Sequence, residues 1–400
     1  MRSRAERGAA GAPALDLDLY SEETVAESAA AFARIRDVGP VVWLPRHRIW
    51  AIGRYDDVRE ALRDDELFVS GHGVAVNPLT NLAARKTTLS SDGETHSTRR
   101  RVLMRSLGAK AIAPVAERLD AEAEAIVAGL VDRGEFDAAR DFSRGLPLRV
   151  VADLVGVRVS SERLLGWAAP TFDVLGPLNR RGLLSGPSSL GMLAYSQRLS
   201  RSRVVPGSWA ASVFDAADRG EISKAEARTM VIDFVAPSLD TTILASTHML
   251  WLLGENPDAW QRLRREPDLI PAAVVEAVRI SSPIRGFSRR LSRAAEVGGV
   301  PLPAGARVVL LFAAANMDER HYPDPERFDL SRPPGGNLGW GNGPHTCVGI
   351  HLAKLEMAAL LRALAARVER IELAGAPTRI RNNTLQGIAS LPVRLHGPTS

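Results

Sequence analysis

The stretch WGNGPHTCVG, residues 340–349, lies just before the last long helical pattern of the chain. It contains Cys347, the one cysteine among 400 residues. A single cysteine excludes internal disulfides and every zinc or iron–sulfur site that needs several cysteines. The flanking glycines let the backbone pass close to something large and flat. A thiolate at the start of a helix is stabilised by free N–H groups and the helix dipole, which suits an anionic sulfur ligand for iron.

Three other interpretations of this stretch compete. A lone cysteine is most often a buried structural residue. Glycines at 339, 341 and 343 before a helix are typical of a phosphate-binding loop, but the preceding strand, the dinucleotide spacing and a lysine are missing. His345 and Cys347 could form a catalytic pair, although residues two apart on a helix are poorly placed for a mutual hydrogen bond. The residues around Cys347 alone leave its role open.

Length and composition bound the function. Four hundred residues suit about two or three ordinary domains or one large domain. A hydrophobic fraction of 45% with 24% charged residues is a soluble, globular composition. No apolar run reaches the roughly 20 residues of a membrane span, and no signal-peptide pattern is present. The net charge of +5 is spread along the chain, so we expect a cytoplasmic protein that binds neither nucleic acid nor membrane.

Short β-type runs dominate the N-terminal part, about residues 38–90. Val41–Leu44 and Trp50–Gly53 flank a basic turn and predict a hairpin. The polar segment Val69–Ser91 predicts a long loop, which in a compact domain is usually functional. Further short strands are expected at Pro283–Gly305 and Glu369–Leu395.

Helical spacing dominates residues 92–282. Ser223–Leu253 has a near-continuous helical pattern that is apolar nearly all round after Val231, so it should run through the centre of the molecule. Leu175–Ser189 is rich in Gly, Pro, Arg and Ser and predicts a mobile connection. Residues 338–368 add the cysteine loop and a last long helix. These patterns predict one large domain, mainly α with a small β region.

Two further motifs precede the cysteine. Glu276 and Arg279 share one face of a predicted helix, so they can form a buried bidentate pair, although such a pair alone is more often at the surface. Asp240 and Thr241 lie in the apolar central helix. A hydroxyl there can relay protons, and a carboxylate can recharge it.

Together these segments resemble the cytochrome P450 family, the haem-thiolate monooxygenases. WGNGPHTCVG resembles the haem-binding signature, in which the cysteine thiolate ligates the iron; Trp340 stands where the family usually has Phe. The matching motifs follow the family's order from about residue 92 to residue 393. The resemblance implies a cytochrome P450 fold, a triangular helical domain with a long central helix, over residues 1–400.

The resemblance also implies roles for particular residues. Glu276 and Arg279 would be joined by Arg327, from the coil before the cysteine, in a structural network. Asp240 and Thr241 would deliver protons to dioxygen at the haem iron. Cys347 would ligate the haem iron. The haem propionates would be bound by His96, Arg100, Arg289 and His345, and the loop glycines Gly341 and Gly349 would also contact the haem.

The central helix departs from the family at one point. Pro237-Ser238 stands where the family usually has Ala-Gly. Proline inside a helix removes one N–H and clashes with the carbonyl four residues back, that of Asp233. It should open the helix locally, as the family's glycine permits, and Ser238 adds a hydroxyl near the oxygen.

The resemblance implies haem b as cofactor and O2 as co-substrate. NAD(P)H would act only indirectly, because the chain has no flavin or nicotinamide module. Electrons would come from a ferredoxin and its reductase, with the chain expected to be a monomer. The basic docking face for an acidic ferredoxin would contain Arg99, Arg101, Arg105, Lys354 and Arg362.

Four segments resemble the bacterial subgroup that O-demethylates small methoxylated aromatics: FDVLGPLN (172–179), APSLDTT (236–242), SPIRGF (282–287) and NTLQG (383–387). One feature resists a benzoate: Asp233 would repel a carboxylate if it faces the pocket, although Arg285 or Arg85 could supply a cation. A neutral methoxyphenol, a benzoate and another small aromatic therefore all stay open. By family analogy the pocket would include Phe172, Val235, Ser238, Ile284, Phe287 and Leu385.

Two alternatives belong to other functional classes. One is a haem-binding sensor or carrier with the same fold, and the other is peroxide-driven catalysis without a redox partner. Both are disfavoured by Asp240 and Thr241, because a carrier needs no proton relay and peroxide-driven relatives usually lack this pair.

Overall fold

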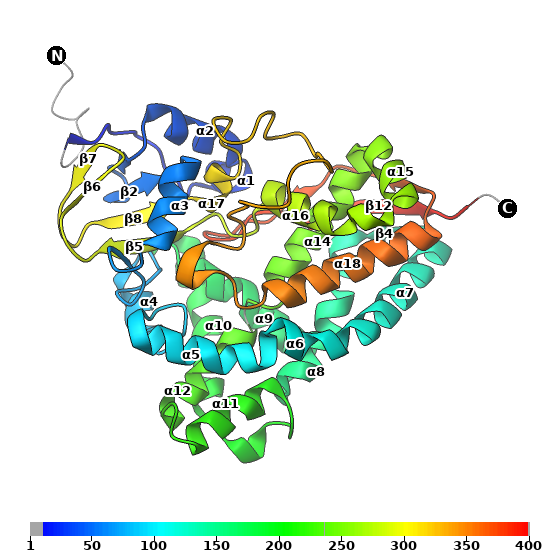
Figure 1. Ribbon diagram of the computed structural model, residues 1–400, viewed down its shortest axis with the longest axis horizontal. Helices are drawn as coiled ribbons and strands as arrows, with labels where there is room; N and C mark the ends of the chain where they lie inside the picture. The colour runs from blue at the N-terminus through cyan, green and yellow to red at the C-terminus, as the bar shows by residue number, and fades with distance from the viewer. Residues whose placement is uncertain (1–10, 236, 399–400) are drawn as a thin grey trace.

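A long buried helix runs through the middle of the molecule (Figure 1). The computed structural model describes residues 11–235 and 237–398. Within them α14 (Asp240–Glu255) is buried along most of its length and contacts α16 (Ile270–Ser281) and α18 (Ile350–Arg367). A helix that is apolar on every side is stable only when it is covered all round. The composition that predicts a central helix therefore also explains its place.

The other helices surround this centre. α7 (Ala116–Arg133) packs along α18 and precedes a buried π-helical turn at Ala138–Ser143. Away from the sheets, the outline in Figure 1 narrows toward α11 (Trp209–Asp218) and α12 (Lys224–Met230), which makes it roughly triangular. The remaining α-helices are α1 (Glu22–Ala26), α2 (Ala29–Val38), α3 (Tyr55–Arg63), α4 (Pro78–Ala83), α5 (Gly93–Leu107), α6 (Ala109–Ile112), α8 (Ala152–Val155), α9 (Ser161–Asp173), α10 (Arg180–Gln197), α13 (Ile232–Val235), α15 (Pro257–Arg265) and α17 (Phe312–Ala315).

The largest sheet lies at one corner of the molecule (Figure 1). Its strands, in spatial order, are β1 (Val42–Leu44), β2 (Ile49–Ile52), β8 (Arg307–Leu310), β5 (Phe287–Leu291) and β3 (Phe68–Val69). Strands β2 and β8 run parallel, and the other neighbouring strands run antiparallel.

Smaller sheets complete the β structure. An antiparallel sheet on the other side of α14 brings the C-terminal strand between two others, in the order β4 (Glu135–Asp137), β12 (Pro392–His396) and β9 (Arg370–Leu373). Two-stranded pairs are formed by β6 (Ala295–Val297) with β7 (Val300–Leu302), and by β10 (Thr378–Arg379) with β11 (Ile388–Ser390). The prediction of a mainly helical chain with a small β region is confirmed.

The predicted helix at Ser223–Leu253 is not continuous. It is divided into α12, α13 and α14, and residues 237–239 form a turn before α14. The expected opening at Pro237 is therefore present, since the proline has no N–H to donate and crowds the preceding turn. The break gives the central helix a new N-terminus inside the molecule.

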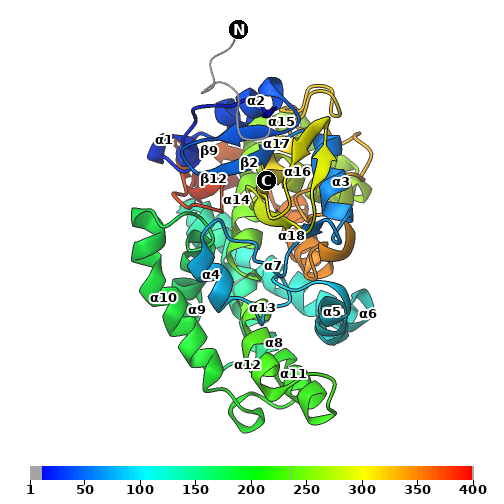
Figure 2. The ribbon, with the colours of Figure 1, turned by 90° about the vertical axis from the view of Figure 1, so that its left-hand side faces the viewer.

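The prediction of a mobile connection at Leu175–Ser189 is wrong from Arg180 onward. That part belongs to α10, which packs along α9 (Figure 2) and carries Pro187 inside it. The Asn179 side chain caps its start by accepting a hydrogen bond from the Gly182 N–H at 3.0 Å. Packing and capping here outweigh a composition that disfavours helix.

No helix in the described part of the chain is long and apolar enough to cross a membrane.

Candidate active site

Cys347 lies in a tight loop just before α18. Its N–H donates to the Trp340 carbonyl at 2.8 Å. Gly341 and Gly343 have φ angles of +71° and +68°, a region that favours glycine. A Cβ on Gly343 would lie 2.5 Å from the Leu62 carbonyl oxygen of α3. The loop therefore requires glycine at these positions to hold Cys347 in place.

A cavity borders the Cys347 thiol, with about 210 Å³ open to the centre of a water molecule. Burial raises the pKa of Cys347, while the Gly349 N–H and the Arg100 guanidinium act in the opposite direction. Gly341 and Gly349 both border the cavity. Its apolar walls are formed by Leu62, Leu89, Leu103, Leu107, Phe172, Ala245, Val278, Ile284, Phe287, Phe312, Trp340, Leu352 and Met357.

Two arginines border the same cavity. Arg289, on β5, is buried and donates to the Ser288 carbonyl at 2.9 Å, and burial lowers its pKa to about 10. Arg100, on α5, donates to the Thr346 carbonyl at 2.7 Å. Neither forms an ion pair with a carboxylate in residues 11–235 and 237–398. Buried guanidinium groups without a counter-ion are costly, so they favour a ligand with anionic groups.

Two histidines complete this end of the cavity. The rings of His96 and His345 stack with centroids 4.1 Å apart. The buried Nε2 of His345 makes no hydrogen bond to the described residues, and lies 3.6 Å from Asp92 Oδ1. Burial, with the charges of His345 and Arg100, lowers the pKa of His96 to about 4. His96 is therefore neutral near pH 7 and can donate one N–H.

These residues fit a haem. Cys347 supplies a sulfur ligand, and the apolar walls suit a flat macrocycle. Arg100, Arg289 and the His345 ring border the cavity and offer donors for the two propionate groups. All four predicted propionate partners thus border the cavity that contains the predicted ligand.

The start of α14 lies at the same cavity. Thr241 borders it, and the Thr241 hydroxyl donates to the Pro237 carbonyl at 2.7 Å, across the helix break. Asp240, the preceding residue, does not border the cavity, and its Oδ2 is buried with no hydrogen-bond partner in the described chain. Burial raises the pKa of Asp240 to about 7, while the charge of Arg144 acts to lower it. Near neutral pH this carboxyl can therefore both take up and release a proton.

Glu276 and Arg279 form the expected bidentate ion pair inside the protein. Arg279 Nε donates to Glu276 Oε2 at 2.7 Å, and its Nη2 donates to Oε1 at 2.8 Å. The Arg279 Nη1 reaches the Asn316 carbonyl at 2.7 Å, and Asn316 Oδ1 accepts from the Leu338 N–H at 2.8 Å. Leu338 precedes the cysteine loop, so the ion pair supports the segment that presents Cys347.

The predicted third member of this network is wrong. The side chain that reaches Glu276 belongs to Arg332, with Nε 3.2 Å from Oε1. Arg327 contributes only its carbonyl oxygen, which is 3.5 Å from Arg279 Nη2. Both arginines lie in the same coil, but the Arg327 side chain is exposed whereas that of Arg332 is largely buried.

The predicted substrate residues divide into two groups. Phe172, Ser238, Ile284 and Phe287 border the cavity. Val235 and Leu385 are buried but do not border it. Leu385 instead forms a backbone bridge with Ile284, and Val235 packs in the apolar core.

Sequence reasoning missed Glu356 on α18. It borders the cavity, both carboxylate oxygens are buried without a partner in the described residues, and burial raises its pKa well above the ordinary value. The signal was a glutamate four residues after Leu352 on the apolar face of the last helix. Asp233 also borders the cavity, and Thr88 lies beside it.

The predicted basic docking face is largely neutralised. Arg99, Arg105 and Arg362 form ion pairs with carboxylates from distant parts of the chain. Arg101 is exposed, and the Lys354 ammonium lies 5.0 Å from the centre of the Trp340 ring. The ion pairs with Arg99, Arg105 and Arg362 are made by Glu226, Glu221 and Asp120, respectively.

Known proteins resemble this chain in sequence. A family model described as Cytochrome P450 matches residues 209–369. The chain is 33% identical over 392 residues to cytochrome p450 CYP199A2 of Rhodopseudomonas palustris. The aligned region covers 96% of this chain and 95% of that protein. It is 30% identical over 405 residues to linalool 8-monooxygenase of Pseudomonas putida, which covers 94% of this chain and 97% of that protein.

Solved structures resemble it in fold. The haem domain of CYP116B5 from Acinetobacter radioresistens superposes with a TM-score of 0.85 at 22% identity, covering 95% of this chain and 97% of that one. CYP109Q5 from Chondromyces apiculatus gives a TM-score of 0.81 at 24% identity, covering 96% and 99%. At these identities the likeness concerns the fold alone.

Proposed function

The chain belongs to the cytochrome P450 family of haem-thiolate monooxygenases, and we propose that it oxidises a small aromatic substrate by O-demethylation or hydroxylation. The observation that carries the proposal is that one largely apolar cavity is lined by Cys347, Thr241, Phe172 and Phe287. The cofactor and the substrate would share this cavity. We propose that residues 1–400 act as a single catalytic domain.

Haem b would be held by Cys347 through its iron and by Arg100, Arg289, His96 and His345 through its propionates. When bound, a thiolate-ligated haem supplies the activation of dioxygen. The thiolate needs stabilisation because burial disfavours the charged form of Cys347. The Gly349 N–H and the Arg100 guanidinium provide that stabilisation.

Asp240 and Thr241 would manage the protons. The Thr241 hydroxyl can hold a water molecule at the cavity edge and pass a proton from it. Asp240, with a pKa of about 7, can recharge the hydroxyl at neutral pH. The broken helix turn supports this role, because the Pro237 carbonyl fixes the Thr241 side chain by accepting its hydrogen bond.

O-demethylation fits a cavity with apolar walls and a nearby proton source. A methyl C–H bond of the substrate is replaced by C–OH, and the resulting hemiacetal splits into a phenol and formaldehyde. The balanced change consumes one methoxyarene, one O2, two electrons and two protons, and also releases water. The apolar walls would exclude bulk water while the ring packs against Phe172 and Phe287.

The two electrons would come from a ferredoxin and its reductase. The exposed Arg101 and the Lys354 ammonium above Trp340 are the remaining cations of the predicted docking face. Arg63, at the end of α3, is exposed next to Gly343 of the cysteine loop and can join them. An acidic partner at this face would be steered toward the Cys347 side of the molecule.

A spectral titration of the ferric enzyme tests the substrate class. Methoxyphenols, methoxybenzoates and plain hydrocarbons are added separately, and the low-spin to high-spin change is recorded. We expect a methoxyaromatic to give the largest change, because it displaces water from the apolar cavity. A strong response only to larger terpene- or steroid-like molecules would retain the monooxygenase but contradict the proposed substrate class.

Thr241→Ala should uncouple reductant use from product formation. A positioned proton donor commonly contributes a factor of about 10² to 10⁴, so most reductant should be diverted into hydrogen peroxide. Peroxide and product are measured per NADH consumed. Thr241→Ser keeps the hydroxyl and should restore most of the coupling; wild-type coupling in Thr241→Ala would refute the assigned role.

A further inference from the structure

Asp233 is a charged group on the apolar wall of the substrate cavity. It lies on α13, just before the helix break, and borders the same cavity as Phe172 and Thr241. Asp233 is half-buried, and it lines this cavity. None of the roles described above uses it.

The Asp233 carboxylate is only partly satisfied. Its Oδ2 accepts a hydrogen bond from the Thr88 N–H at 3.0 Å. The Thr88 hydroxyl also favours the ionised carboxylate. Among the described residues, however, no hydrogen bond reaches Oδ1 and the carboxylate forms no ion pair. The nearby Arg99 guanidinium is committed elsewhere, because it donates to Glu226 Oε1 at 2.8 and 3.2 Å and to the Thr87 carbonyl at 3.1 Å.

Burial raises the pKa of Asp233 to about 6, while Thr88 and the charge of Arg99 lower it. The group is therefore mainly ionised at pH 7.5, although it is enclosed. An enclosed carboxylate with a free oxygen is costly unless a donor meets it. A ligand that brings an O–H to Oδ1 would remove this cost, whereas a ligand with a second carboxylate would increase it.

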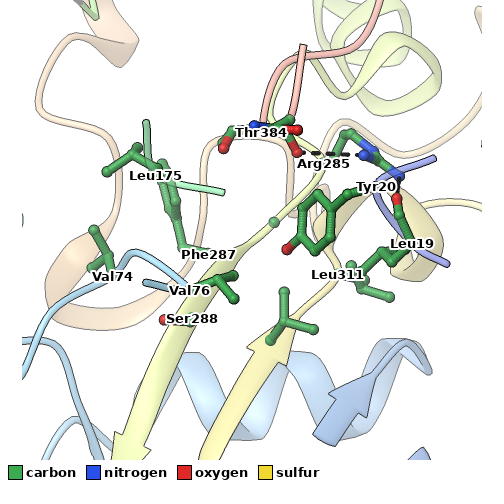
Figure 3. A pocket seen from close by; sticks show the side chains of 13 residues that line it. Leu19, Tyr20, Val74, Val76, Leu175, Arg285, Phe287, Ser288, Leu311 and Thr384 are labelled. Atoms are coloured by element: carbon green, nitrogen blue, oxygen red, sulfur yellow. Dashed lines mark hydrogen bonds between the residues drawn. The ribbon is translucent and has the colours of Figure 1, made fainter. Parts of the chain in front are cut away.

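Neither of the two cations that the sequence offers for an anionic substrate, Arg285 and Arg85, borders the cavity. Arg285 lines a separate small cavity instead (Figure 3). Its guanidinium donates to the Leu19 carbonyl at 2.9 Å and lies over the Tyr20 ring. Arg85 is exposed and does not border the substrate cavity. The arginines that do border it, Arg100 and Arg289, are the haem propionate partners described above.

We propose that Asp233 is the specificity-determining residue of the substrate cavity, where it accepts a hydrogen bond from a phenolic hydroxyl and excludes aromatic carboxylates. The proposal rests on the proposed function and narrows its substrate class from small methoxylated aromatics to methoxyphenols. Asp233 acts on binding and orientation and takes no part in proton delivery.

The test compares three probes that share a para-methoxy ring: 4-methoxyphenol, 4-methoxytoluene and 4-methoxybenzoate. Their dissociation constants for the haem-loaded enzyme are measured at pH 7.5 by isothermal titration calorimetry and by the ferric spin change. Asp233→Asn keeps the shape without the charge, and Asp233→Ala removes the acceptor. Asp218→Asn makes the same chemical change on the exposed end of α11 and is the matched control.

The wild type and the Asp218→Asn control should bind 4-methoxyphenol about 10- to 100-fold more tightly than 4-methoxytoluene, the range expected for a hydrogen bond to a charged acceptor. They should bind 4-methoxybenzoate most weakly. Asp233→Ala should lose the preference for the phenol, and Asp233→Asn should bind the benzoate at least about tenfold more tightly than the wild type. Equal binding of phenol and benzoate by the wild type, or an unchanged phenol preference in Asp233→Ala, would overturn the proposal.

Failure of the proposed function is distinguishable from failure of this inference. Asp233-dependent binding of 4-methoxyphenol without formaldehyde release in turnover would support the role of Asp233 and refute demethylation. Formaldehyde release from the methoxyaromatics with no dependence of binding on Asp233 would refute the specificity role and support demethylation.

Discussion

Replacing Cys347 with alanine should abolish the thiolate-ligated haem. The reduced, carbon-monoxide-bound protein should lose the long-wavelength absorption band that a thiolate ligand gives, and turnover should fall to background. The reason is that the chain holds one cysteine, so the protein has no second thiolate to take over. Cys347 also lies in a loop whose glycines fix its backbone beside the cavity.

Cys347→Ser is the matched variant for this prediction, because it keeps the size and the backbone of the loop. It should also lose the thiolate band while retaining the fold, which circular dichroism reports. If either variant keeps the thiolate band at wild-type intensity, Cys347 is not the ligand.

Replacing Glu276 with alanine should give mostly haem-free, unstable protein. The change leaves Arg279, which is 1% exposed, and Arg332 without their carboxylate inside the protein. Breaking a buried ion pair in this way costs about 3–5 kcal/mol. Because Arg279 reaches the Leu338 segment through Asn316, the loss should also disturb the loop that presents Cys347. Haem content per protein and the midpoint of urea unfolding measure both effects.

Two arginine variants test which arginine supports the Glu276–Arg279 pair. Arg332→Ala removes a side chain that contacts Glu276, whereas Arg327→Ala removes an exposed side chain and leaves the carbonyl in place. We expect a clear loss of haem and stability in the first variant and near wild-type values in the second. The opposite order would favour the sequence-based assignment of Arg327, and a stable, fully haem-loaded Glu276→Ala would refute the structural role of the pair.

The parts of the site that the sequence predicts well share a local signal. Cys347 has glycines around it at short spacing, and Glu276 and Arg279 follow the helical period. Pro237 breaks a helix for a reason of covalent geometry, so the opening before Asp240 can be read from the chain. In each case neighbouring residues determine the geometry.

The parts that it misses depend on contacts between distant segments. Arg327 and Arg332 lie in one coil without a period, so spacing cannot tell which side chain turns inward. Arg99 pairs with Glu226 and Arg362 with Asp120, partners that sequence patterns do not reveal. The same holds for the fold at α10, where packing on α9 overrides a composition rich in glycine and proline.

Product analysis with 4-methoxyphenol tests the central claim most directly. The haem-loaded enzyme is supplied with a ferredoxin, its reductase, NADH and O2, and formaldehyde and hydroquinone are measured together. The account predicts equal amounts of the two products from the wild type, and neither product from Cys347→Ala. Consumption of 4-methoxyphenol without formaldehyde, or oxidation only of larger lipophilic molecules, would contradict it.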